Sequence, residues 1–173
     1  VVVAFEGKDS DGMIQTLKIK ADGIITKLKK FEHDTNLGQH NALVRVDDNT
    51  VALAYYASNK GTLKTFDIAA DGTITQVASK DFSTGSNAGK YNQLVRLNTN
   101  IFVHAYSGVS ADGFIDAYDI SADGKTIALK KSLEHDEVQN SYNSLIKIGL
   151  NRVALAYTGI DTDGFVKSFD ITS

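Results

Sequence analysis

The hydrophobic and polar positions of this chain alternate in short runs that are separated by turn-forming residues. In residues 62–68, for example, Leu63 and Thr65 alternate with Lys64 and Phe66. A period of two is typical of a β-strand, because successive side chains of a strand point to opposite faces. Nowhere do the apolar residues keep a helical spacing for three turns. The pattern therefore predicts an all-β protein.

The predicted strands recur with a nearly fixed period. A short apolar strand starts at residues 1, 51, 102 and 153, so the copies are spaced by 50, 51 and 51 residues. A second strand, an Asp-Gly turn and a third strand follow, and a fourth strand covers residues 43–46, 94–97 and 145–148. A fixed period in this range predicts a repeat protein. We divide the chain into units 1–50, 51–101, 102–152 and a partial unit 153–173 of a single repeat domain.

Four short antiparallel strands in about 50 residues are typical of one blade of a β-propeller. The units contain four, four, four and two predicted strands, which amounts to about three and a half blades. A β-sandwich or barrel with internal duplication is the alternative. Because open sheet edges favour pairing with another chain, we expect either self-association or a longer native chain that completes a ring.

Residues 143–148, 154–159 and 164–171 show the layout of one copy most clearly. There a hydrophobic strand that ends in glycine is followed by an aromatic-bearing strand that ends in Asp. This layout resembles the blades of Kelch-like and FG-GAP-like propellers. The chain has no Gly-Gly pair, no tryptophan and therefore no Trp-Asp dipeptide. The resemblance thus concerns the plan of a blade and assigns no specific family.

Composition and charge narrow the classes of function. Hydrophobic residues make up 42% and charged residues 23% of the chain, as in ordinary globular proteins. A net charge of −3 argues against non-specific binding of nucleic acid. No apolar stretch approaches the roughly 20 residues of a membrane-spanning helix. The absence of cysteine excludes disulfides, and a start at Val1 suggests a processed product or a portion of a longer protein.

The loops after the first strands of two copies each carry a pair of carboxylates before a glycine. These pairs are Asp9 with Asp11 and Asp161 with Asp163. Oxygen ligands at this spacing suit calcium, and the resemblance to FG-GAP-like propellers implies calcium in a comparable loop. The third copy keeps only Asp112, however, and the second has Lys60. Turns in which the Asp side chain caps the backbone are the alternative.

A second recurring group precedes the fourth predicted strand of each unit. Asn follows an aromatic or imidazole ring in three places: His40 and Asn41, Tyr91 and Asn92, Tyr142 and Asn143. Rings that stack on a sugar, next to amides that donate hydrogen bonds, would form repeated glycan sites on one rim. The alternative is an Asn that closes a turn before the strand.

Two copies carry the sequence Glu-His-Asp at the end of the third strand, with His33 and His135 in the middle. Such a His could bind zinc, transfer protons or act as a pH sensor. We favour a structural role in which each His ties a loop to a neighbouring strand. Counted back from Asn92, residues 83–85 are the expected counterpart in the second copy.

The repeats therefore carry equivalent groups rather than one singular catalytic cluster. Equivalence favours multivalent binding over catalysis, so the sequence predicts a non-enzymatic recognition or adhesion module that is extracellular or at a cell or particle surface. Lectin-like sugar binding is the sharper form of this hypothesis. A structural subunit of a surface or filament assembly, joined through open blade edges, is the second hypothesis. A propeller enzyme with its site in the central channel is the third. We also expect Ala156 to lie in a tightly packed strand.

Overall fold

The computed structural model describes residues 1–172 as fourteen strands in four antiparallel sheets. Sheet A contains β1 (Val2–Glu6), β2 (Gly12–Ile19) and β3 (Ile25–Asp34). Sheet B contains β4 (Gln39–Arg45), β5 (Thr50–Tyr56), β6 (Lys60–Ile68) and β7 (Ile74–Thr84). Sheet C contains β8 (Lys90–Arg96), β9 (Ile101–Ser107), β10 (Gly113–Ile120) and β11 (Ile127–Asp136). Sheet D contains β12 (Ser141–Lys147), β13 (Arg152–Thr158) and β14 (Gly164–Asp170).

Helical structure among residues 1–172 is limited to three short 3₁₀ turns, η1 (Lys8–Ser10), η2 (Val109–Ala111) and η3 (Ile160–Thr162). Within this part of the chain, no helix has the length and apolar character that crossing a membrane requires. The prediction of an all-β protein is confirmed.

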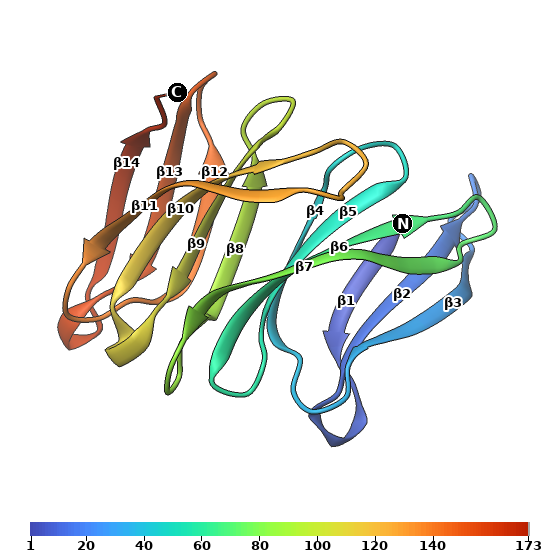
Figure 1. Ribbon diagram of the computed structural model, residues 1–173, viewed down its shortest axis with the longest axis horizontal. Coiled ribbons are helices and arrows are strands. Elements are labelled where there is room, and N and C mark those ends of the chain that lie inside the picture. Colours follow the sequence, from blue (N-terminus) through green and yellow to red (C-terminus); the bar gives the residue numbers. More distant parts are fainter. Residues whose placement is uncertain (173) are drawn as a thin grey trace.

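The four sheets stand side by side in chain order, from sheet A at one end to sheet D at the other (Figure 1). The first strands of sheets B, C and D pack closely, β4 against β8 and β8 against β12. The last strands β3, β7 and β11 approach one another much less. The sheets therefore fan out from a shared inner edge, which confirms the predicted propeller-like arrangement of twisted blades.

The grouping of strands into sheets differs by one strand from the grouping that the sequence predicts. The fourth predicted strand of each unit does not pair with the three strands before it but opens the next sheet, so the sheets contain three, four, four and three strands. A tight hairpin explains the difference: Val46 N–H donates to the Thr50 carbonyl and joins β4 to β5. The periodic pattern gives the strands and their number, but it does not show which turn crosses between sheets.

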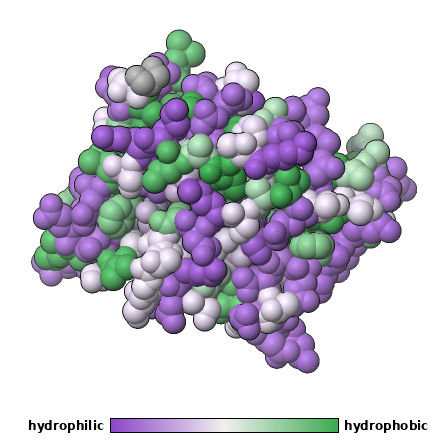
Figure 2. Space-filling model, viewed as in Figure 1, coloured by the Kyte–Doolittle hydropathy of each residue, from purple (hydrophilic) through white to green (hydrophobic). Residues whose placement is uncertain are grey.

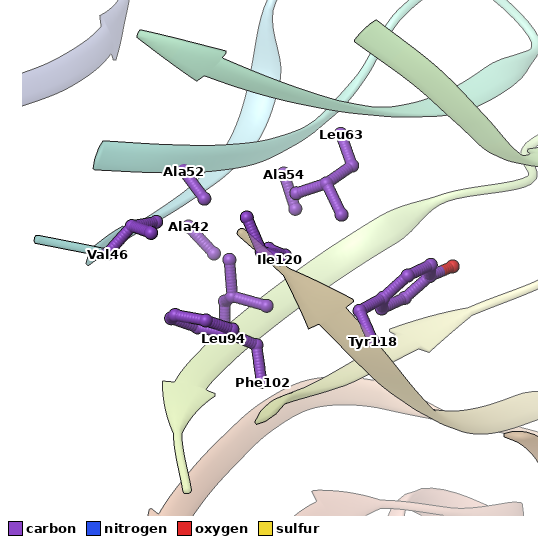
Figure 3. Packing of buried hydrophobic residues seen from close by; sticks show 9 residues of the cluster. All are labelled: Ala42, Val46, Ala52, Ala54, Leu63, Leu94, Phe102, Tyr118 and Ile120. Carbon is purple, nitrogen blue, oxygen red and sulfur yellow. The ribbon is translucent and has the colours of Figure 1, made fainter. Parts of the chain in front are cut away.

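Alternating side chains of the middle strands bury both faces of each inner sheet. On β5, Ala52 and Ala54 pack toward sheet C, whereas Leu53 and Tyr55 pack toward sheet A. Figure 3 shows the cluster between sheets B and C, where the small alanines face larger side chains. The cluster consists of Ala42, Val46, Ala52, Ala54, Leu63, Leu94, Phe102, Tyr118 and Ile120. Small residues on one sheet let the next sheet approach closely.

The outward faces of the two terminal sheets have no neighbouring sheet among the described residues. Ala156 lies on the outward face of sheet D and is exposed, so the expectation that it is tightly packed is wrong. Its counterpart on β5, Ala54, is fully buried. The sequence motif is the same in both places, and only the presence of a following sheet distinguishes them.

This difference predicts opposite outcomes for two identical substitutions. Ala54→Glu places a carboxylate in the dry interface between sheets B and C and should lower the free energy of unfolding by several kcal/mol. Ala156→Glu should change it by no more than about 0.5 kcal/mol in dilute solution. Urea unfolding followed by circular dichroism measures both values. Equal losses in the two variants would contradict the assignment of the open face.

Candidate functional site

Three strained residues mark the inner edge of the fan. His40, Tyr91 and Tyr142 lie near the start of β4, β8 and β12, with φ angles of 52°, 52° and 51°. At each of these places the pairing with the next strand shifts register, as in a β-bulge. Positive φ is uncommon for a bulky side chain and costs conformational energy. The strained positions thus recur at one edge of the fan, one in each of sheets B, C and D.

The three rings form one continuous strip across sheets B, C and D. The ring centroids of His40 and Tyr91 are 4.7 Å apart, and those of Tyr91 and Tyr142 are 4.9 Å apart, with tilted planes. Tyr142 is 72% exposed, so its ring is accessible from solvent. We call His40, Tyr91 and Tyr142 the aromatic strip. The structure thus brings the predicted ring positions of three copies into one surface.

The neighbouring side-chain amides donate to backbone carbonyls, and Asn92 and Asn143 are buried whereas Asn41 is half-buried. The Asn92 side-chain amide donates to the carbonyls of His40 (3.0 Å) and Gly89 (2.8 Å), and the Asn143 amide donates to the Tyr91 carbonyl (2.9 Å). Asn41 donates to the Gly38 carbonyl at 2.8 Å. Asn92 and Asn143 therefore tie His40 and Tyr91 to the following sheet. Contacts with a ligand from this group would come from the rings.

Charged groups from two other strands surround the His40 end of the strip. Glu6, at the end of β1, accepts a hydrogen bond from the Gln39 side chain at 2.8 Å. The Lys90 ammonium donates to the Asn87 side chain at 2.7 Å and lies 5.1 Å from the Tyr56 ring centroid. Glu6 and Lys90 were not predicted from the sequence, because each occurs in one copy only.

These surroundings keep His40 neutral at pH 7. Its pKa lies below the ordinary value, first because partial burial disfavours the imidazolium and second because the Lys90 ammonium repels it; the Glu6 carboxylate opposes both effects. Burial also raises the pKa of Tyr91, with a further contribution from Tyr142. The strip therefore offers a neutral imidazole that can accept a proton next to phenols that can donate hydrogen bonds.

A cavity of about 510 Å³ adjoins the strip at Tyr91. Its walls come from the loop before β8, the end of β9 and the turn η2, and they carry Ser86, Asn87, Lys90, Tyr91, Ser107, Val109, Ser110 and Ala111. The lining combines hydroxyl groups with one ammonium and contains no carboxylate. This chemistry suits a polar ligand with a negatively charged or developing negative group.

The predicted calcium loops lie at the same end of the strands but have a simpler explanation. Asp9 and Asp161 adopt φ angles of 59° and 55° inside η1 and η3. Ser110 adopts 63° at the same position of η2, so the loop takes this shape without the first carboxylate. No group of three or more His, Cys, Asp or Glu side chains within residues 1–172 could hold a metal ion. Calcium binding at Asp9, Asp11, Asp161 and Asp163 stays a prediction.

His33 and His135 pack between neighbouring sheets, in the structural role that we favoured. His33 lies edge-on to Tyr55 of sheet B at 4.5 Å between centroids, and Asp34 accepts the Tyr55 hydroxyl at 3.0 Å. His135 lies 5.0 Å from Tyr157 of sheet D, whose hydroxyl donates to Asp136 at 2.7 Å. These contacts fasten sheet A to sheet B and sheet C to sheet D.

The counterpart in the second copy is Phe82, so the alignment of residues 83–85 with this group is wrong. The residue pairs Gly61–Ser83 and Thr62–Asp81 leave Phe82 bulged out of the ladder, as Gly12–Asp34 and Met13–Glu32 leave His33. Phe82 lies 4.7 Å from the Tyr106 ring of sheet C. Each bulged ring covers a glycine: a Cβ on Gly61 would come within 2.2 Å of Phe82. The recurring glycine was the available sequence signal.

The polar side chains between sheets B and C differ from those between sheets A and B and between sheets C and D. Asp116 stands where the corresponding strands carry Lys64 and Lys167, and it accepts the Tyr118 hydroxyl at 2.9 Å. Burial raises the pKa of Asp116. His104 is fully buried, contacts the Asn92 side-chain oxygen at 2.9 Å and has its pKa lowered by burial to about 3. His104 is thus a neutral core residue.

Comparison with solved structures was made at the level of the fold. The chain matches a periplasmic gluconolactonase of Pseudomonas aeruginosa with a TM-score of 0.63 and 15% identity, over 96% of this chain and 50% of that one. It matches a putative 6-phosphogluconolactonase of Bacteroides fragilis with a TM-score of 0.67 and 16% identity, over 99% and 47%. A NanB sialidase of Streptococcus pneumoniae gives 0.64 and 12%, over 92% and 27%.

The fold is of the propeller type. The chain spans about half the length of the two lactonases. No family model matches the chain, and no curated protein matches it in sequence. The Kelch-like and FG-GAP-like layout therefore stays a resemblance.

These comparisons correct the predicted class of function. We expected a non-enzymatic recognition or adhesion module, with an assembly subunit as the alternative, whereas the matched propellers are named as gluconolactonase, 6-phosphogluconolactonase and sialidase, which are enzymes. Equivalence among the repeats does not exclude catalysis, because a site can also contain residues that occur in one copy only. Glu6 and Lys90 are such residues, and both lie close enough to His40 to affect its pKa.

The inter-sheet histidines predict a loss of stability in mild acid. Burial, followed by the Lys64 or Lys167 ammonium, lowers the pKa of His33 and of His135 to about 4, against about 6.5 in the unfolded chain. Between these values the unfolded chain binds more protons, so the free energy of unfolding should fall as pH drops from about 6.5 to about 4.

A variant with His33→Phe and His135→Phe should lose less stability over this pH range than the original chain. Phe82 shows that phenylalanine fits this position. Urea unfolding at a series of pH values measures the effect. Parallel pH dependence in the two proteins would show that these histidines are not the groups responsible.

Proposed function

We propose that this chain supplies part of the active site of a propeller hydrolase that acts on a sugar-derived lactone. The observation that carries the proposal is the proximity of a neutral imidazole, an ammonium group and two tyrosine rings, one of them exposed, along the aromatic strip. The names of the two matched lactonases support the substrate class. Because this chain spans about half of those proteins, the proposal concerns one part of a complete site.

His40 would act as the general base. It accepts a proton from a water molecule, whose oxygen attacks the carbonyl carbon of the lactone and forms a tetrahedral oxyanion. When this intermediate collapses, the ester C–O bond breaks, and the ring oxygen leaves as a hydroxyl group that takes the proton back. Glu6 limits the fall of the His40 pKa, so the imidazole remains basic enough for this role.

Lys90 would stabilise negative charge in the same step. Its ammonium group lies at the wall of the cavity next to Tyr91, and the lining supplies hydroxyl donors but no carboxylate that would neutralise it. A positive charge aimed at a developing oxyanion stabilises the transition state more than the ground state. The same group would bind a carboxylate or phosphate substituent of the sugar.

A lactone fits these groups better than a glycoside does. Hydrolysis of a glycoside commonly uses two carboxyl groups that flank the scissile bond. The charged groups that shift the pKa of His40 are one carboxylate and one ammonium. Ester opening needs one base and one oxyanion-stabilising group, which His40 and Lys90 supply.

The proposal extends to location. The matched Pseudomonas aeruginosa enzyme is named periplasmic, which supports a periplasmic or secreted location for this protein. The expected extracellular location is compatible with this proposal, and attachment to a cell or particle surface stays a prediction.

Substitution of His40 tests the catalytic role. His40→Asn keeps a residue that tolerates positive φ but removes the base, so kcat for gluconolactone opening should fall at least about 100-fold. Leu129→Asn, which changes a half-exposed side chain on the outer strand β11, serves as the matched control and should keep kcat unchanged. Lactone opening is followed by the release of acid. An unchanged kcat in His40→Asn, or preference for a sialic acid glycoside, would contradict the proposal.

The pH profile gives an independent readout of the same group. Because the pKa of His40 lies below its ordinary value, kcat/KM should be constant at neutral pH and fall only below about pH 6.5. The acid limb should disappear in His40→Asn. An inflection above neutrality would exclude His40 as the base.

The exposed ring of Tyr142 should contribute to substrate binding. Tyr142→Asn preserves the positive φ but removes the stacking surface, and loss of about 1.4 kcal/mol corresponds to a tenfold rise in KM. Leu150→Asn removes a comparably exposed side chain from the turn after β12 and is the control. Steady-state kinetics on both variants should show the rise in KM for Tyr142 only.

A further inference from the structure

The two ends of the stack present complementary halves of the same interface. On sheet D, Val166 is 77% exposed, although its counterpart on β6, Leu63, is fully buried beneath sheet C. Ala156 is likewise exposed where Ala54 is buried. The open face of sheet D is therefore similar in composition to the face of sheet B that packs against sheet C.

Sheet A presents the opposite half. Val2 and Ala4 pack toward sheet B, so the alternate side chains of β1 point away from it. These are Val1, Val3 and Phe5, with exposed fractions of 67%, 36% and 36%. Their counterparts Leu53 and Tyr55 are buried against sheet A. The open face of sheet A is therefore similar in composition to the face of sheet B that packs against sheet A.

One hydrogen bond recurs between neighbouring sheets, and each terminal sheet carries only one of its two partners, the donor on sheet D and the acceptor on sheet A. The Thr16 hydroxyl donates to the Gly72 carbonyl of the next sheet at 2.8 Å, and the Thr65 hydroxyl donates to the Gly124 carbonyl at 2.7 Å. The corresponding donor on sheet D is Ser168, which is exposed. The corresponding acceptor on sheet A is Gly23, whose turn has φ +84° and open space around it.

We propose that a second copy of this chain docks on these faces, so that sheet D of each copy packs against sheet A of the other. The contact continues the sheet-to-sheet interface that the chain forms three times within itself. The matched lactonases are about twice as long as this chain, so two copies supply about as much chain as one such propeller. The contact is head-to-tail, and two of them close a ring.

The two faces differ in the size of their side chains. Sheet D contributes small alanines with Val166, whereas sheet A contributes Val3 and Phe5, as small and large residues oppose one another in the cluster of Figure 3. In Figure 2, green hydrophobic residues reach the surface near the end where sheet D lies in Figure 1. Burial of these residues would provide the driving force, since apolar area removed from water stabilises a complex.

Sedimentation equilibrium of the chain over a wide concentration range tests the proposal. A reversible change from one to two chain masses is expected. Val166→Lys on sheet D and Val3→Glu on sheet A should each give a monomer with an unchanged circular dichroism spectrum. Mixing the two variants should restore a dimer, because one of its interfaces then pairs Lys with Glu and the other is unaltered.

Leu133→Glu is the control, because Leu133 is 50% exposed on the outer strand β11, away from both open faces. This variant should associate as the original chain does. A monomer at every concentration, association that survives both Val166→Lys and Val3→Glu, or a mixture that stays monomeric would each overturn the proposal. None of these results depends on hydrolase activity, so a failure here is separate from a failure of the proposed function.

Discussion

The fold depends on burying both faces of each sheet. A sheet between two others must alternate two apolar sets along its middle strand, and β5 does so with Ala52 and Ala54 on one face and Leu53 and Tyr55 on the other. The small set lets the next sheet approach, and the larger set fills the space toward the sheet before it. Because the inner strands approach most closely, the sheets diverge outward, and the starts of β4, β8 and β12 converge at one edge.

The sequence was informative where periodicity has a direct physical cause. Alternation predicted the strands, and the repeat predicted fourteen of them, as observed. It could not show that β4 belongs with β5, because a hairpin and a crossing between sheets both look like polar turns. The repeat also did not show that Phe82 corresponds to His33. Each of these residues is bulged out of its strand, and the bulge is identified from the strand register. The sequence showed that Asn92 belongs to a recurring group. It could not show that its amide donates to the His40 carbonyl, because this hydrogen bond forms only where sheets B and C lie side by side.

Repetition also hides the residues that make the candidate site asymmetric. His40, Tyr91 and Tyr142 occupy one repeated position, yet only His40 has a carboxylate and an ammonium group close enough to shift its pKa. Those groups, Glu6 and Lys90, come from different sheets and have no repeated counterpart that a comparison of copies would highlight. A chain can therefore keep its repeated residues for packing between sheets and obtain a distinctive site from a few single substitutions at the convergent edge.

The four histidines differ in where they lie in the fold. His33 and His135 occupy a position that Phe82 fills equally well, so their rings act there mainly through shape and contact with a tyrosine. His104 is enclosed on all sides. His40 stands at the edge, on a strained backbone and beside groups of both charges. Burial lowers the pKa of all four, but only His40 lies at the shared edge, where its ring is 4.7 Å from that of Tyr91, a residue that lines the cavity. Position relative to the shared inner edge, rather than residue type, decides which histidine suits catalysis.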